Sequence, residues 1–250
     1  MKKIKVGAVG YLNTRPLLFG MQSEEFLREN ELVSDYPAKV ASMLLSGEVD
    51  VALLPVAVLA ELPEYFIVSK YCIGSTAEVA SVCLFSEVPV DQLTEVYLDY
   101  QSRTSVALFK LLMQDYWKIQ PRLLDAGDES YRTRIHGTTG AVVIGDRALE
   151  QRRLSTFIYD LSAAWNAMTS LPFVFAAWVS LRQLPETWIQ QFDAAQSVGL
   201  QQLSTIAEAG KYSPYDLFKY YTTNLSYELD AEKKKGMDIF LQKLKEQQSV

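Results

Sequence analysis

Histidine and cysteine are scarce in this chain of 250 residues. His136 is the single histidine, which excludes sites built from several imidazoles and relays that need two of them. Cys72 and Cys83 are the only cysteines, and they form no CxxC pair. A tetrahedral zinc site of the usual kind is therefore excluded, and we expect no metal centre.

The chain also lacks a strong excess of one charge and any long apolar run. It has 24 Lys and Arg against 30 Asp and Glu, which gives a formal net charge of −6. The only basic run, residues 233–235, has the pattern of a solvated helix face and not of a surface that binds nucleic acid. No stretch approaches the roughly 20 apolar residues of a membrane span. After Met1, Lys2 and Lys3 the apolar residues are interrupted by Lys5, unlike a signal peptide. We expect a cytoplasmic protein that binds neither nucleic acid nor a membrane.

Hydrophobic residues make up 49% of the sequence, enough for a large core. The first part of the chain alternates apolar, strand-like runs with stretches of helical spacing, which indicates a parallel sheet covered on both faces. Strands are predicted at residues 4–9, 32–36 and 49–54, and helices at 17–27, 38–45 and 56–59.

The second part repeats this alternation, and no Gly/Ser/Pro-rich linker separates the two. This pattern indicates two α/β lobes joined by crossing strands, with a site in the cleft between them, at the carboxyl ends of strands. Extended segments are predicted at 65–73, 80–86, 95–99, 122–125, 141–144 and 157–161, helices at 106–116 and 147–151, an apolar run at 171–181, and helix throughout 186–244.

Polar residues mark the turn between the first strand and the first helix. Asn13 and Thr14 follow the strand, and Pro16 fits the first helical position. Free N–H groups at a helix start attract anions, so this turn is a candidate binding site. The alternative is that Asn13 or Thr14 only caps the helix.

A second turn of the same kind contains Ser102, Arg103, Thr104 and Ser105. Its three hydroxyls and one guanidinium could hold a carboxylate through charge-assisted hydrogen bonds. Equally, Ser102 could be an N-cap with Arg103 in solvent. No Walker or GxGxxG pattern occurs, so we expect no nucleotide cofactor.

Three further polar residues have both a functional and a structural interpretation. Ser81 borders a predicted crossing strand and could also be an ordinary strand hydroxyl; no GxSxG turn supports a Ser-His-Asp hydrolase. Asp146 could reach the cleft or cap the helix that follows it. His136 lies in a polar loop, where an exposed residue is the simpler expectation.

Six segments of the sequence resemble one known family, the chorismate dehydratases of menaquinone biosynthesis by the futalosine route. The likeness runs nearly from end to end in the right order, through residues 6–17 (VGAVGYLNTRPL), 45–55 (LSGEVDVALLP), 81–86 (SVCLFS), 99–105 (DYQSRTS), 144–149 (IGDRAL) and 171–178 (LPFVFAAW). The resemblance implies a type II periplasmic-binding-protein-like fold with a central cleft. It places lobe 1 at residues 1–90 with 176–250, and lobe 2 at 91–175.

The resemblance also implies a carbon–oxygen lyase that dehydrates chorismate to 3-[(1-carboxyvinyl)oxy]benzoate without a cofactor. Asn13 matches the family's catalytic asparagine, and Ser81 matches its substrate-contacting serine. The implied substrate-binding residues are Tyr11, Thr14, Ser102, Thr104, Ser105 and Asp146. The pattern assigns no role to Arg15 and indicates no oligomeric state.

The matched cleft segments contain no histidine, and no Glu or Lys placed as a base. We therefore expect substrate assistance, in which the enolpyruvyl carboxylate of chorismate takes the ring proton while Asn13 and Ser81 orient it. Two alternatives stay open at this point. One is a non-catalytic binding protein for small carboxylates, and the other is the sister enzyme, 1,4-dihydroxy-6-naphthoate synthase.

Overall fold

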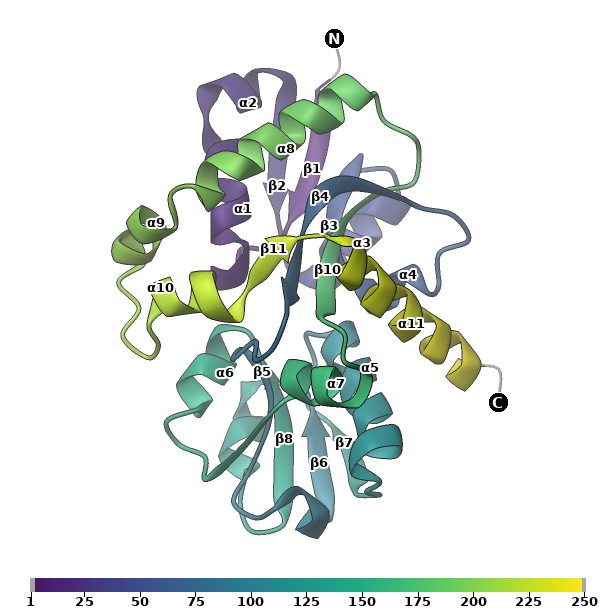
Figure 1. The fold of residues 1–250 in the computed structure, drawn as a ribbon, viewed down its shortest axis with the longest axis vertical. Helices are drawn as coiled ribbons and strands as arrows, with labels where there is room; N and C mark the ends of the chain where they lie inside the picture. The colour runs from purple at the N-terminus through teal and green to yellow at the C-terminus, as the bar shows by residue number, and fades with distance from the viewer. Residues whose placement is uncertain (1–2, 249–250) are drawn as a thin grey trace.

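Two β-sheets, one above the other, organise the computed structural model, which describes residues 3–248 (Figure 1). Met1 and Lys2, part of the charged N-terminal segment considered above, lie outside the described residues. The first sheet has the order β11-β4-β10-β3-β1-β2 and the second the order β7-β6-β8-β5-β9. The chain builds most of the first sheet, crosses to the second, and returns to complete the first.

The strands follow the apolar runs of the sequence closely. The first sheet contains β1 (Ile4–Ala8), β2 (Asn30–Ser34), β3 (Val51–Pro55), β4 (Phe66–Ser75), β10 (Phe173–Ser180) and β11 (Ser226–Glu228). The second sheet contains β5 (Val82–Ser86), β6 (Glu95–Leu98), β7 (Arg122–Asp125), β8 (Thr139–Ile144) and β9 (Phe157–Asp160).

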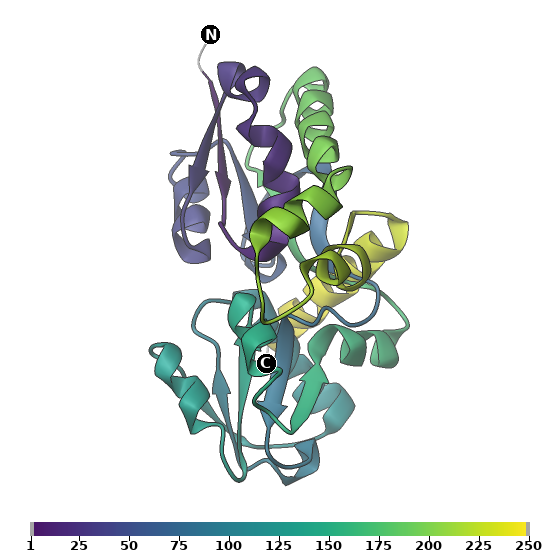
Figure 2. The same cartoon turned by 90° about the vertical axis from the view of Figure 1, so that its left-hand side faces the viewer.

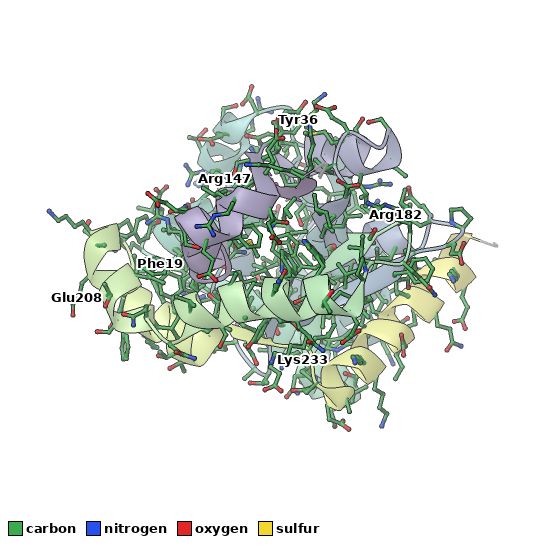
Figure 3. All side chains as sticks on the ribbon, turned by 90° about the horizontal axis from the view of Figure 1, so that it is seen from above. Phe19, Tyr36, Arg147, Arg182, Glu208 and Lys233 are labelled. Atoms are coloured by element: carbon green, nitrogen blue, oxygen red, sulfur yellow. The ribbon has the colours of Figure 1, made fainter. Side chains whose placement is uncertain are left out.

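Helices cover both faces of the first sheet. Seen from above, Tyr36 at the start of α3 and Lys233 near the start of α11 lie on opposite sides of the lobe (Figure 3). The helices of this lobe are α1 (Arg15–Phe19), α2 (Glu24–Glu29), α3 (Pro37–Leu45), α4 (Val56–Leu59), α8 (Glu186–Leu200), α9 (Leu203–Gly210), α10 (Leu217–Lys219) and α11 (Ala231–Gln248). The second lobe has α5 (Arg103–Leu112), α6 (Asp146–Gln151) and α7 (Leu161–Thr169).

The prediction of a parallel sheet in the first part of the chain is right only in part. β1 pairs in parallel with β2 and β3, but β10 runs antiparallel to both β3 and β4. The direction reverses because β10 carries the chain back from the second lobe. The sheets are therefore mixed, and the overall α/β class is as expected.

Two elements depart from the predicted pattern. The segment expected to be helical throughout is interrupted by β11, which pairs antiparallel with the edge of β4. Tyr227, the middle residue of β11, is buried between two exposed or half-buried neighbours, as in a half-buried strand. α7 is absent from the predicted elements; it begins because Asp160 accepts hydrogen bonds from the backbone N–H groups of Ser162 and Ala163.

The predicted boundaries between the lobes are at residues 90/91 and 175/176. The strand pairing shows that the chain crosses between the lobes before each of these boundaries. β5 pairs with β8 and β9 of the second sheet, although it precedes residue 91. β10 belongs to the first sheet, although it begins at Phe173. The chain therefore crosses between β4 and β5, and crosses back between β9 and β10.

The C-terminal segment joins the lobes. α11 packs against α4 and β10 of the first lobe and against α5 of the second, and Lys243 Nζ lies 2.8 Å from Asp115 Oδ2. Figure 2 shows this segment, from α9 to α11, beside the junction of the lobes. One hydrophobic cluster of buried residues runs through both lobes, which therefore share a core. Within residues 3–248, no helix is long and apolar enough to cross a membrane.

Candidate active site

A cavity of about 90 Å³ lies between the two lobes, at the ends of strands from both sheets. Apolar side chains such as Val9, Leu53 and Phe175 form part of its wall. The polar residues of the wall are Tyr11, Asn13, Thr14, Ser81, Gln101, Ser102 and Ser105. Six of the eight site residues expected from the sequence thus lie here; Thr104 and Asp146 do not.

Asn13 contributes an amide oxygen that has no hydrogen-bond partner in the described part of the chain. It lies in a short 3₁₀ turn, Leu12–Thr14, between β1 and α1. Its Oδ1 atom is buried, and within residues 3–248 it accepts no hydrogen bond. No side chain caps α1 here, so the capping alternative for Asn13 and Thr14 is wrong. A buried polar atom without a partner requires an explanation, and a ligand in the cavity supplies one.

Thr14 holds the turn that presents Asn13. Its Oγ1 lies 2.5 Å from the backbone oxygen of Val9 and 2.8 Å from that of Tyr11, so its hydrogen is engaged within the turn while the residue lines the cavity. Helix α8 fixes α1 from the other side. A Cβ atom on Gly199 would lie 1.8 Å from the Pro16 carbonyl oxygen, so only glycine permits this approach.

Tyr11 belongs to a hydrogen-bonded network that reaches into the second lobe. Its hydroxyl donates to Gln101 Oε1 at 2.8 Å, and Arg147 Nη2 donates to the same oxygen at 3.0 Å. Arg147 pairs with the buried Asp99 at 3.0 Å, and Tyr131 donates to Asp99 Oδ2 at 2.6 Å. Burial raises the pKa of Tyr11 to about 12, so its hydroxyl remains a neutral donor.

Gln101 and Arg147 are site residues that the sequence patterns missed. A signal for Gln101 was present, because it directly precedes Ser102 in the polar turn at the end of β6. Arg147 lies behind the cavity wall as half of an ion pair with Asp99, and its hydrogen bond orients Gln101. No local pattern indicates that role, because Arg147 belongs to a different strand–helix junction from Gln101.

Ser102 and Ser105 face the cavity from the start of α5. Ser102 Oγ accepts the Ser105 N–H at 3.1 Å, so Ser102 is an N-cap and a cavity residue at once. The Ser102 hydroxyl donates to Ser105 Oγ at 2.8 Å. Arg103 is exposed and pairs with Glu61 of the first lobe. The first turn of a ten-residue helix, with two hydroxyls beside it, is suited to holding an anion.

Thr104 and Asp146 connect the lobes outside the cavity wall. Thr104 Oγ1 accepts the Ala57 N–H at 3.1 Å, because its side chain points to a different side of α5 from Ser102 and Ser105. Asp146 does not cap α6; its Oδ1 accepts the Leu12 N–H at 3.3 Å. Burial raises the pKa of the Asp146 carboxyl, an effect opposed by the Leu12 N–H and by Arg15.

His136 is away from the cavity. Its side chain is 86% exposed, as the sequence predicts, and its Nδ1 lies 2.9 Å from Glu87 Oε2. Hydrogen bonds from the Gly137 N–H and from His136 lower the pKa of Glu87. The single histidine is therefore far from the chemistry of the cavity.

The cavity wall combines apolar side chains with neutral polar groups. Among residues 3–248, no Asp, Glu, Lys, Arg or His lines it. In the same part of the chain, no three His, Cys, Asp or Glu side chains gather as they would around a metal ion. The donors available to a ligand are hydroxyls, amides and backbone N–H groups.

Two α/β lobes, two crossing segments and a cavity at the strand ends define the type II periplasmic-binding-protein fold. Solved structures agree. A crystal structure of an Archaeoglobus fulgidus protein has a TM-score of 0.75 at 13% identity, covering 99% of this chain and 98% of that one. The periplasmic aliphatic sulphonate binding protein SsuA from Escherichia coli has a TM-score of 0.64 at 15% identity, covering 100% and 94%.

The particular family follows from the sequence over nearly its whole length. The chain belongs to the menaquinone biosynthesis family, whose sequence profile matches residues 4–246. It is 28% identical to a Thermus thermophilus protein named chorismate dehydratase, over 98% of this chain and 96% of that protein.

Proposed function

We propose that this protein is a chorismate dehydratase, a lyase that removes water from chorismate to give 3-[(1-carboxyvinyl)oxy]benzoate. The observation that carries the proposal is the buried Asn13 amide oxygen, which has no partner among residues 3–248, in a cavity whose described wall contains no Asp, Glu, Lys, Arg or His. Family membership and the named relative support it. The family's route makes this an early step of menaquinone biosynthesis, which we place in the cytoplasm.

The reaction breaks one C–H bond and one C–O bond of the ring. The proton leaves the carbon that carries the ether, the electron pair forms the new ring double bond, and the ring hydroxyl leaves with a proton as water. Aromatisation supplies the driving force. The protein must orient the base, stabilise the charge that develops, and exclude competing rearrangements.

The absence of charged side chains from the described cavity wall supports a base supplied by the substrate. We propose that the enolpyruvyl carboxylate takes the ring proton, because tethering it to the ring gives it a high effective concentration. Asn13 and Ser81 hold that side chain in the reactive geometry. An amide is too weak a base to take the proton itself, so its role is to position and to stabilise charge.

The start of α5 is the proposed site for the second carboxylate of chorismate. Removing the ring proton spreads negative charge through the diene into the ring carboxylate. Ser102, Ser105 and the N-terminal turn of α5 lie on the second-lobe side of the cavity, where they can stabilise that charge. Arg147, whose charge is paired with Asp99, orients Gln101 beside this site.

The test is to incubate the purified protein with chorismate alone and to follow ring aromatisation by ultraviolet absorbance. We expect the product spectrum to appear without added metal or nucleotide. A protein that only binds carboxylates would raise its melting temperature with chorismate and leave the spectrum unchanged. A protein that neither binds nor converts chorismate would contradict the proposal.

A further inference from the structure

Ser81 ends a crossing segment whose backbone is held in an uncommon conformation. Ala80 has a φ of +62°, in the left-handed region that residues other than glycine rarely occupy. Asp160 of the second lobe holds this turn: its Oδ1 accepts the Val79 N–H at 3.2 Å and its Oδ2 accepts the Ala80 N–H at 2.7 Å. The Gly145 N–H donates to the Ser81 carbonyl at 2.7 Å.

A second group of contacts reaches the same segment from the C-terminal part of the chain. Residues Tyr220–Asn224 form a π-helical turn after α10, a local irregularity common at functional sites. Asn224 Nδ2 donates to the Glu78 carbonyl at 3.1 Å, and the Tyr220 hydroxyl donates to Ser81 Oγ at 2.7 Å. The π turn therefore holds both ends of residues 78–81.

The hydrogen bond from Tyr220 determines which further hydrogen bonds the Ser81 hydroxyl can form. A serine hydroxyl has one hydrogen to donate and two lone pairs to accept with. Tyr220 occupies one lone pair, and within residues 3–248 Ser81 Oγ makes no other hydrogen bond. Because Ser81 lines the cavity, its hydrogen is left to a ligand there.

We propose that Tyr220 is a positioning residue for the dehydration, which makes Ser81 a fixed hydrogen-bond donor to the enolpyruvyl carboxylate of the substrate. This inference rests on the proposed function. Tyr220 is fully buried, and burial raises the pKa of its phenol far above the usual value, so the phenol stays a donor.

Tyr221 provides a matched control. It is buried like Tyr220, but its hydroxyl has no partner in the described part of the chain. Tyr220→Phe and Tyr221→Phe each remove one buried oxygen from the same π turn. We expect Tyr220→Phe to lower kcat for chorismate about tenfold with little change in KM, and Tyr221→Phe to change kcat less than about twofold. Melting curves of both variants report whether the fold is retained.

A double-mutant cycle separates positioning from general support of the fold. In the Ser81→Ala background, Tyr220→Phe should lower kcat by less than about twofold, because the group it positions is absent. The same tenfold loss in that background would overturn the inference, and so would wild-type kcat in the single Tyr220→Phe variant. Wild-type protein that leaves chorismate unchanged would overturn the proposed function itself, and this inference with it.

Discussion

Tyr11 and Gln101 stand 90 positions apart in the sequence, and a hydrogen bond of 2.8 Å between their side chains joins the two lobes at the cavity wall. One of the contacts that connect the lobes is thus also part of the cavity wall. Arg147 donates to the same Gln101 oxygen, so this amide cannot rotate without breaking two bonds. The cavity wall is therefore rigid at this point.

Tyr11→Phe removes the hydrogen bond to Gln101 and leaves the ring in place. We expect KM for chorismate to rise about three- to tenfold, the net value of one hydrogen bond. Steady-state kinetics would measure this change. Tyr212→Phe is the control, because Tyr212 donates to the Asp146 carbonyl at 2.8 Å and also joins the lobes, but does not line the cavity. Equal increases in KM in the two variants would contradict a specific role for Tyr11.

Asn13→Ala removes the amide whose oxygen has no partner among the residues that the structure describes. We expect kcat to fall by at least about 100-fold, as for loss of a group that stabilises developing charge. Asn13→Asp should be similarly slow, because it sets an anion beside a substrate with two carboxylates. Chorismate aromatisation followed by absorbance measures both. A turnover rate near wild type in either variant would refute the assignment.

Thr104→Val removes the hydroxyl that accepts the Ala57 N–H and leaves a buried donor unsatisfied. We expect the free energy of unfolding to fall by about 1–3 kcal/mol. Thr104→Ser keeps the acceptor and should lose much less. Urea unfolding of the two variants provides the measurement. A large rise in KM with Thr104→Ser, at wild-type stability, would instead place Thr104 in contact with substrate.

Asp146→Asn tests the buried carboxyl beside Leu12. The folded protein raises the pKa of Asp146 above its usual value near 4, so it favours the protonated form. Compared with an asparagine at this position, the carboxyl therefore stabilises the fold most at pH values below its usual pKa. This stabilisation is lost as the pH rises through the raised pKa. Urea unfolding between pH 4 and 7 should show the stability of the wild type, measured against Asp146→Asn, falling as pH rises. A relative stability that increases with pH would mean a lowered pKa.

Local patterns in the sequence predict where the site forms, because strand–turn–helix junctions identify the strand ends that meet between the lobes. Asn13 and Ser102 belong to two such junctions, and both line the cavity. The same patterns do not say which way each side chain points. Ser102 and Ser105 are three residues apart and lie on one side of α5, whereas Thr104 faces Ala57. The helical spacing of these residues could have predicted that Thr104 points away from the two serines.

Tyr220 shows what local sequence cannot supply. It lies 139 positions from Ser81, in a segment expected to be continuous helix, and nothing around it indicates a contact with the crossing strand. β11 escaped prediction for a related reason, since a strand of three residues is stabilised by its partner rather than by its own composition.

The position of β11 has a consequence for synthesis of the chain. All strands of the second sheet end by Asp160, but the outer edge of β4 is covered only when residues 226–228 arrive. β10 covers the other edge of β4 once Ser180 is made, and at about 5–20 residues per second the 48 positions from 180 to 228 take roughly 2–10 s to synthesise. During that interval the nascent protein presents an open strand edge to its neighbours on the polysome, a period in which a chaperone would protect it.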